Sequence, residues 1–151
     1  RGQQINLLYS NDKFSVPPNL YIIGMMNTAD RSLALLDYAL RRRFSFVEIN
    51  PAFENETFKF YVDQVNNPAV LLRVIEEIKR LNNQIVEELG TGFQIGHSYF
   101  VGDAYKVDTV NRIEEVIEYE IIPQLFEYWF DDEQKANDWA ERLRGCYDGE
   151  K

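Results

Sequence analysis

The feature that most constrains the fold is a short apolar run at residues 20–24, LYIIG, which contains no alternating polar residues. Such a run is typical of a β-strand covered on both faces, as in a parallel sheet with helices on either side. A polar cluster, MNTADRS at residues 26–32, follows almost at once. Ligands bind just past the carboxyl ends of strands in open α/β sheets, so this cluster is a candidate for chemistry.

The first fifty residues contain only part of an α/β core. Residues 32–43 have leucines at spacings of three and four, which predicts a helix, and residues 44–49 predict another strand. Residues 5–9 and 13–16 flank an Asn-Asp turn and predict a hairpin. One crossover unit and a hairpin cannot cover both faces of a parallel sheet. We therefore expect the remaining strands and helices to come from outside this sequence.

The sequence after Asn50-Pro51 predicts helices, so we place a domain boundary there, with an α/β unit at residues 1–50 and a helical unit at residues 51–151. The strongest helix has a stripe along one face, made of Leu71, Ile75, Ile78, Asn82, Ile85 and Leu89, and Gly90 is placed to cap it. Asp108 or Thr109 can cap a later helix, which Pro123 should break or kink. Residues 92–102 contain three glycines and several aromatics, which favours a short hairpin or a structured loop. The predicted helices span residues 53–65, 69–89, 108–122, 125–130 and 132–143.

The composition limits the kinds of site that the chain can carry. With 151 residues, of which 45% are hydrophobic, it has room for one ordinary core and at most a small second one. Cys146 is the single cysteine and His97 the single histidine, which excludes an internal disulfide and argues against thiolate or multi-histidine metal sites. The apolar stretches fall short of the roughly 20 residues that cross a bilayer, and the start lacks a signal layout. We expect a cytoplasmic protein that does not associate with membranes.

The net charge of −9 is unevenly distributed. Residues 1–50 hold six Lys or Arg against four Asp or Glu, whereas residues 51–151 hold ten against 21. Binding to phosphates needs a basic face, which most of this surface cannot supply. The sequence therefore argues against direct binding of nucleic acid by this chain.

Residues 19–51 resemble the second half of the nucleotide-binding core of McrB-type AAA+ proteins, the motor subunits of restriction systems that act on modified DNA. The family signature Met-Asn-x-x-Asp-Arg is present at residues 26–31, and the segment DYALRRRF at residues 37–44. IGHSYF at residues 95–100 and IEYEIIPQLFEYWF at residues 117–130 are similar to the family's helical lid. The resemblance implies the C-terminal part of an AAA+ P-loop NTPase core followed by an all-α lid, mostly helical overall.

The resemblance assigns a role to each residue of the polar cluster that matches the signature. Asn27 stands where the family places its sensor, a side-chain amide that orients the water attacking the γ-phosphate. The alternative is that Asn27 or Thr28 caps the following helix, with Asp30 near its positive end, and the two roles are compatible. Asp30 and Arg31 could pair with each other, hold the sensor loop or contact a partner subunit.

Arg41, Arg42 and Arg43 correspond to the edge of an AAA+ subunit that faces the nucleotide of its neighbour. A guanidinium there could act as an arginine finger, because it is planar and always charged. The alternative is three cations that complement the negative carboxyl end of a helix. In the lid, the resemblance places His97 and Ser98 where a second sensor contacts nucleotide, although a lone histidine among aromatics is more often a packed or capping residue.

The resemblance implies a full-length protein that hydrolyses GTP (or ATP) with Mg²⁺ as a homo-oligomeric ring, a hexamer by analogy. Its partners would be a McrC-type endonuclease and, through a separate domain, DNA. This sequence contains neither a G-x-x-x-x-G-K-[ST] phosphate loop nor a strand-borne Asp-Glu pair. We therefore expect the chain alone neither to bind nucleotide tightly nor to hydrolyse it. Two alternatives stay open, an ATP-using AAA+ remodelling enzyme and a non-enzymatic helical interaction module.

Overall fold

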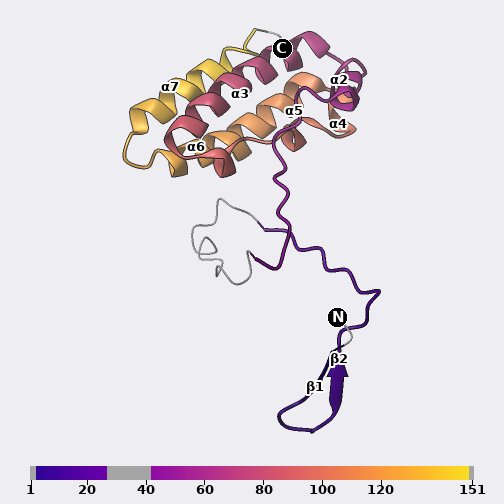
Figure 1. Cartoon of the computed structure of the whole chain (residues 1–151). Coiled ribbons are helices and arrows are strands. Elements are labelled where there is room, and N and C mark those ends of the chain that lie inside the picture. The colour runs from indigo at the N-terminus through magenta and orange to yellow at the C-terminus, as the bar shows by residue number, and fades with distance from the viewer. Residues whose placement is uncertain (1–2, 27–41, 150–151) are drawn as a thin grey trace.

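The structure is a computed structural model that describes residues 3–26 and 42–149, and most of its regular structure is helical (Figure 1). A short hairpin precedes the helices. Two 3₁₀ turns, η1 (Thr91–Phe93) and η2 (His97–Phe100), and one π turn, η3 (Ile117–Ile121), lie among them. The strands and helices are β1 (Gln4–Asn6), β2 (Lys13–Ser15), α2 (Glu56–Val62), α3 (Pro68–Glu88), α4 (Ala104–Val107), α5 (Thr109–Val116), α6 (Ile122–Tyr128) and α7 (Glu133–Arg144).

The hairpin predicted near the N-terminus is confirmed. β1 and β2 pair antiparallel, with Ile5 opposite Phe14. Asn11 lies in the turn at a φ of 57°, a left-handed conformation that asparagine tolerates better than most residues. The strands are shorter than the apolar pattern suggested.

The two strands predicted at residues 20–24 and 44–49 are wrong for this structure, in which both segments lie outside any sheet. A strand needs a neighbour for its backbone N–H and C=O groups, and within the described residues the one sheet consists of β1 and β2 alone. Both segments are exposed, with Ile23 at 93% and Val47 at 84% of their maximal accessible surface. The helix predicted at residues 32–43 lies almost entirely outside the described residues.

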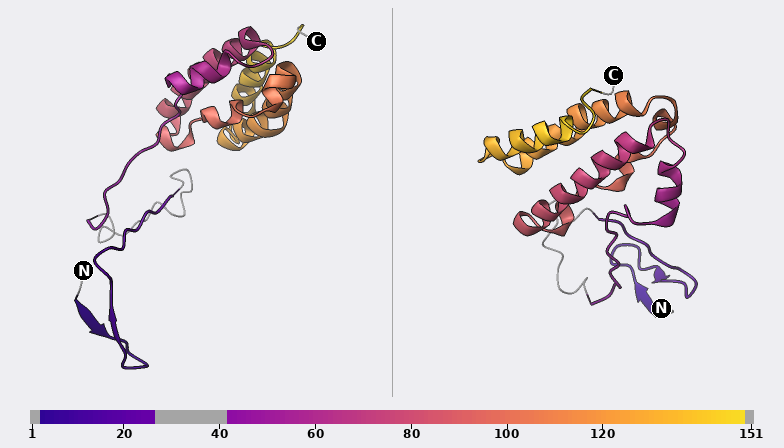
Figure 2. Two further views of the ribbon diagram at one scale, coloured as in Figure 1. Left: turned by 90° about the vertical axis from the view of Figure 1, so that its right-hand side faces the viewer. Right: turned by 90° about the horizontal axis from the view of Figure 1, so that it is seen from above.

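The helical unit is a three-helix bundle. Its members are α3, the continuous helix formed by α5, η3 and α6, and α7, and each of the three contacts the other two (Figure 2). The apolar stripe predicted along one face of α3 is confirmed as core, and it includes Asn82, which is 4% exposed. The helix stripes from all three members supply the fully buried centre, which includes Leu71, Ile78, Leu81, Ile85, Ile113, Ile117, Ile121, Leu125 and Leu143.

The helices begin at side chains that accept the otherwise unpaired backbone N–H groups of the first turn. Asp108 caps α5 by accepting from the N–H of Asn111 at 3.1 Å, as the sequence predicts. Asp132 caps α7 in the same way, accepting from the N–H of Lys135 at 3.2 Å. These caps set where the bundle's helices start and therefore which residues fall in the intervening loops.

Pro123 does not break its helix, contrary to one of the two expected outcomes. The preceding turn widens to a π turn, in which the N–H of Ile122 donates to the carbonyl oxygen of Ile117. A wider turn makes room for a proline ring that would otherwise clash with the carbonyl four residues earlier. The same turn carries Glu118, which forms hydrogen bonds of 2.6 Å to Arg144 at the end of α7.

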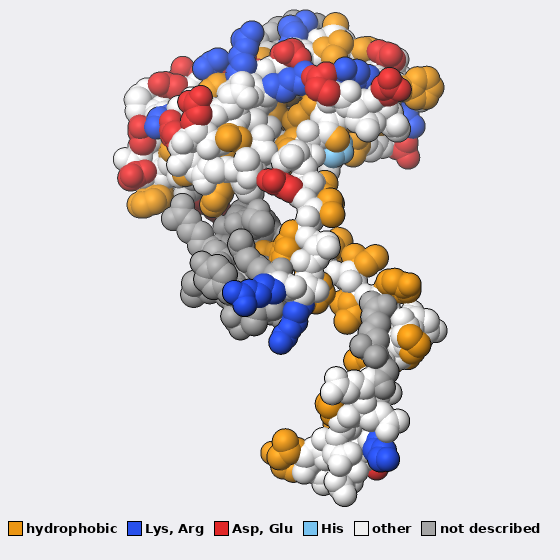
Figure 3. Space-filling view, viewed as in Figure 1, with side chains coloured by type: hydrophobic (Ala, Val, Ile, Leu, Met, Phe, Trp, Pro, Cys, Tyr) orange, Lys and Arg blue, Asp and Glu red, His pale blue; other side chains and the backbone are white. Residues whose placement is uncertain are grey.

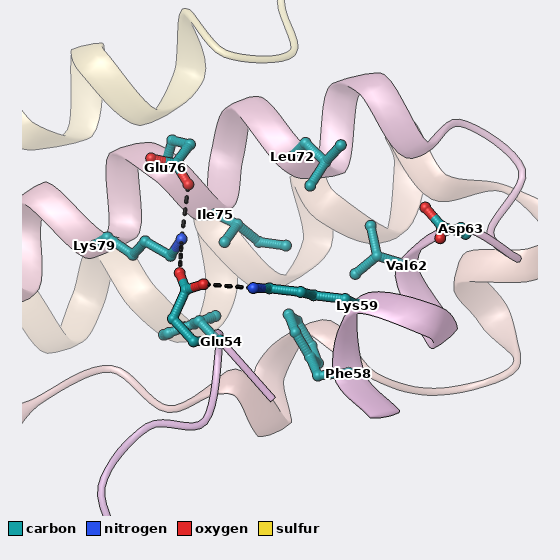
Figure 4. Close-up of a pocket in the computed structure, with 10 residues that line it drawn as sticks. Glu54, Phe58, Lys59, Val62, Asp63, Leu72, Ile75, Glu76 and Lys79 are labelled. Atoms are coloured by element: carbon teal, nitrogen blue, oxygen red, sulfur yellow. Dashed lines mark hydrogen bonds and ion pairs between the residues drawn. The ribbon is translucent and has the colours of Figure 1, made fainter. Parts of the chain in front are cut away.

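The pocket between α2 and α3 has an apolar floor and an ion-paired rim (Figure 4). Glu54 lies between Lys59 and Lys79, and Lys79 also contacts Glu76. Hydrogen bonds from Lys59 and then Lys79 lower the pKa of the Glu54 carboxyl to about 2. Because Glu54, Lys59 and Glu76 are exposed and Lys79 is only partly buried, salt screens their attraction.

We expect this rim to stabilise the fold only while Glu54 is ionised. A pKa lowered by folding gives stability that is complete above the ordinary value of 4.5 and is lost as the pH falls toward 2. Glu54→Gln should therefore lower the melting temperature slightly at neutral pH, and the difference from the unchanged chain should disappear between pH 4.5 and 2. Thermal unfolding against pH measures this, with exposed Glu87→Gln as the control. A difference that persists at pH 2 would contradict the explanation.

Candidate functional site

The segment from Gly90 to Gly102, here called the 90–102 loop, connects α3 to α4 and carries both lid residues singled out from the sequence. Gly90 and Gly102 have backbone φ values of 103° and 139°, which residues other than glycine rarely adopt. Between them the chain forms the two 3₁₀ turns, so of the two predicted possibilities the structured loop is confirmed and the hairpin is wrong.

The buried side chain of Asn82 holds the middle of the 90–102 loop. Its amide nitrogen donates to the carbonyl oxygen of Ile95 at 2.9 Å, and its amide oxygen accepts from the N–H of Ile95 at 2.7 Å. Both backbone groups are buried and would be unpaired without this side chain. Asn82 was predicted only as part of the helix stripe, and its signal in the sequence was one amide among apolar residues.

Three tyrosines from other helices hold the rest of the loop. Tyr128 donates to the carbonyl oxygen of Phe93 at 2.9 Å, and Tyr105 donates to that of Tyr99 at 2.8 Å. Tyr61 both donates to and accepts from the backbone of Gly102. Burial raises the pKa of all three phenols, so they remain protonated donors over the ordinary pH range. The loop is therefore fixed to α2, α3, α4 and α6.

We expect Asn82→Ala to be among the most destabilising substitutions in the helical unit. It would leave the buried N–H and C=O of Ile95 unpaired, which should lower the free energy of unfolding by about 2–4 kcal/mol. Urea unfolding followed by tryptophan fluorescence measures the change. Asn83→Ala is the matched control, because its side chain lies on the exposed face of the same helix. Equal losses of unfolding free energy in the two variants would show that the hydrogen bonds from Asn82 to Ile95 contribute little to stability.

His97 lies at the start of η2 and faces the segment that enters the helical unit. Its Nδ1 accepts a hydrogen bond from the backbone N–H of Ala52 at 3.1 Å. The ring also makes edge contacts with Phe53 and Phe58, at centroid distances of 6.2 and 5.7 Å. Ser98 is exposed beside it. The packed and capping role weighed for His97 is thus present, and a nucleotide contact by His97 or Ser98 stays a prediction.

The remaining predicted site residues lie in or beside the part of the chain that the structure does not describe. Asn27, Asp30, Arg31 and Arg41 fall outside the described residues. Arg42 and Arg43 are exposed in a turn. Within the described residues, no hydrogen bond or ion pair joins these two arginines to the 90–102 loop. Their roles as sensor and finger remain predictions.

The surface of the helical unit carries charges of both signs. On the face shown in Figure 3, acidic and basic side chains are interspersed over the helices. Among residues 3–26 and 42–149, no group of three or more His, Cys, Asp or Glu side chains is arranged to hold a metal ion. No helix in the same ranges is long and apolar enough to cross a membrane.

Comparison with known proteins finds one match to the helical unit and one to nearly the whole chain. Residues 73–137 match the family model described as "McrB, alpha-helical lid domain", a range that covers α3 from its second turn, the 90–102 loop, α4, α5 and α6. The chain is also 44% identical over 157 aligned residues to the "Type IV methyl-directed restriction enzyme EcoKMcrB subunit" of Escherichia coli (strain K12). That alignment covers 96% of this chain but only 34% of the relative, so the chain spans about a third of the length of the curated protein it matches. The two matches confirm the resemblance to McrB-type proteins that was predicted from the sequence.

Proposed function

We propose that this chain contributes the sensor, the arginine finger and the helical lid of a McrB-like AAA+ motor that hydrolyses GTP. The motor would work as a hexameric ring with a McrC-type nuclease in the restriction of modified DNA, which a separate domain would recognise. The observation that supports this most is the 44% identity to a methyl-directed restriction subunit, which extends over 96% of the chain. The alignment therefore extends well beyond the lid into the segments that hold the predicted sensor and finger.

In this proposal each predicted residue acts on a different part of the reaction. The Asn27 amide accepts from and donates to the attacking water, which it orients toward the γ-phosphate. Arg42 or Arg43, with Arg41 beside them, stabilises negative charge that develops on the phosphoryl group at the neighbouring subunit. Asp30 and Arg31 hold the sensor segment or the subunit contact.

In this proposal the chain does not by itself bind nucleotide or Mg²⁺ tightly. A phosphate loop and an Asp-Glu pair at a strand end are missing from the sequence, and the described residues contain no cluster suited to a metal. Both would have to be held by the two thirds of a McrB-like protein that lie outside the matched region. The proposal therefore assigns this chain the orientation of water and the stabilisation of charge, but not the binding of phosphate or metal.

The exposed apolar residues near the N-terminus also support the proposal that residues 1–50 belong to a larger α/β core. Ile22, Ile23 and Met25 are between 66% and 96% exposed, and Val47 and Ile49 exceed 80%. Apolar side chains in such numbers normally pack against other elements. Additional elements of such a core would cover these side chains.

Turnover by the full-length protein tests the proposal. The protein that contains this chain and its upstream sequence should hydrolyse GTP, and excess ATP should compete poorly. The purified 151-residue chain should show no hydrolysis above background with either nucleotide. Preferential use of ATP would favour a remodelling ATPase, and an upstream sequence without a phosphate loop would favour a non-enzymatic module. Turnover by the 151-residue chain would overturn the division of roles.

A further inference from the structure

The segment that leads into the helical unit is tied to the 90–102 loop by side chains on both sides of the contact. The N–H of Ala52 donates to His97 Nδ1, and the hydroxyl of Thr91 donates to Glu48 Oε1 at 3.0 Å. Phe53 is 5% exposed and packs between the rings of Phe58, Phe100 and His97. Residues 48–53, here called the linker, therefore meet the loop at three points.

The direction of the hydrogen bond at Ala52 fixes the chemical state of His97. A ring nitrogen that accepts an N–H cannot itself carry a proton, so the imidazole is neutral and its proton is on Nε2. Nε2 can then only donate a hydrogen bond, whereas Nδ1 already accepts one from the linker. The loop that carries this ring is itself fixed by Asn82 and three tyrosines, so the ring is a fixed point on the helical unit.

We propose that His97 is a positioning residue, which through Nδ1 sets the direction in which the linker leaves the helical unit. Residues 44–50 are exposed along their length, so the contacts at Glu48, Ala52 and Phe53 are where the described structure restrains this part of the chain. If the proposed function holds, the same contacts between the linker and the 90–102 loop would fix Arg42 and Arg43, which precede the linker, relative to the lid. This last consequence rests on the proposed function, whereas the contacts themselves do not.

A pair of amide substitutions separates the two ring nitrogens. The side-chain oxygen of asparagine reaches about the position of Nδ1, and the longer glutamine places its amide near Nε2. The primary measurement is amide hydrogen exchange of Ala52 in the 151-residue chain, which needs no nucleotide and no turnover. If Nδ1 holds the linker, His97→Asn should keep the Ala52 amide protected, and His97→Gln should exchange it roughly 5- to 10-fold faster, as expected for the loss of one hydrogen bond.

Each outcome decides the proposal. Retained protection in His97→Gln, whether or not His97→Asn also retains it, would overturn the role of Nδ1. If both variants lose protection, the imidazole ¹⁵N signals of the unchanged chain decide. A proton on Nε2 alone supports the role of Nδ1 as the acceptor from Ala52, and a proton on Nδ1 overturns it. Melting temperatures of both variants provide the control for general destabilisation. A failure of GTP hydrolysis in the full-length protein would refute the proposed function but leave these results unaffected.

Discussion

Asn27→Ala in the full-length protein should lower the maximal rate of GTP hydrolysis by about 10²-fold while leaving nucleotide binding nearly unchanged. An amide that orients the attacking water contributes to the transition state more than to the bound ground state, so its removal appears in the rate. Single-turnover hydrolysis and equilibrium nucleotide binding, measured on the same preparation, separate the two effects.

Thr28→Ala is the matched control for this experiment, because Thr28 is the neighbouring candidate for a helix cap. A cap removed from either position should lower stability by about 0.5–2 kcal/mol and leave the rate of the folded protein intact. A large loss of binding at an unchanged rate in Asn27→Ala would favour the structural role. The same result in both variants would show that the polar cluster acts as a helix start.

The sequence predicted the helical unit well because its helices carry their own signals. The stripe along α3, the cap at Asp108 and the helix end at Gly90 depend on spacing within one element, and each is present in the structure. Pro123 gave a less specific signal. A proline disfavours a regular α-turn, but the sequence does not show that a π turn will absorb it.

The strands predicted at residues 20–24 and 44–49 are wrong for this structure. A strand is defined by its neighbours, and apolar content alone does not supply the backbone partners. The geometry around the 90–102 loop was missed for a related reason. Asn82 contacts Ile95 and His97 contacts Ala52 across 13 and 45 positions of sequence, and such pairings follow from how the helices pack.

Replacement of Arg42 and Arg43 by alanine should stop hydrolysis in the full-length ring while leaving each subunit able to bind its own nucleotide. An arginine finger contributes on the order of 10³-fold or more to the rate at the neighbouring site. A cation that only complements the end of its own helix contributes about 0.3–1 kcal/mol to stability and has no such effect. The rate of the variant ring and its melting temperature therefore distinguish the two roles.

Mixing two inactive proteins makes this distinction directional. One protein lacks Arg42 and Arg43, and the other has its phosphate-loop lysine replaced. Mixed rings contain interfaces at which an intact arginine faces an intact nucleotide site, so partial hydrolysis should return on mixing if the arginine acts on its neighbour. Single replacements of Arg41, Arg42 and Arg43 then identify the residue responsible, and Arg112→Ala, in the helical unit, serves as the unrelated arginine control. If mixed rings assemble but show no hydrolysis, the arginine-finger role is wrong. Arginines that only complement the end of their own helix make no contribution to the neighbouring nucleotide site, so mixing would restore no activity.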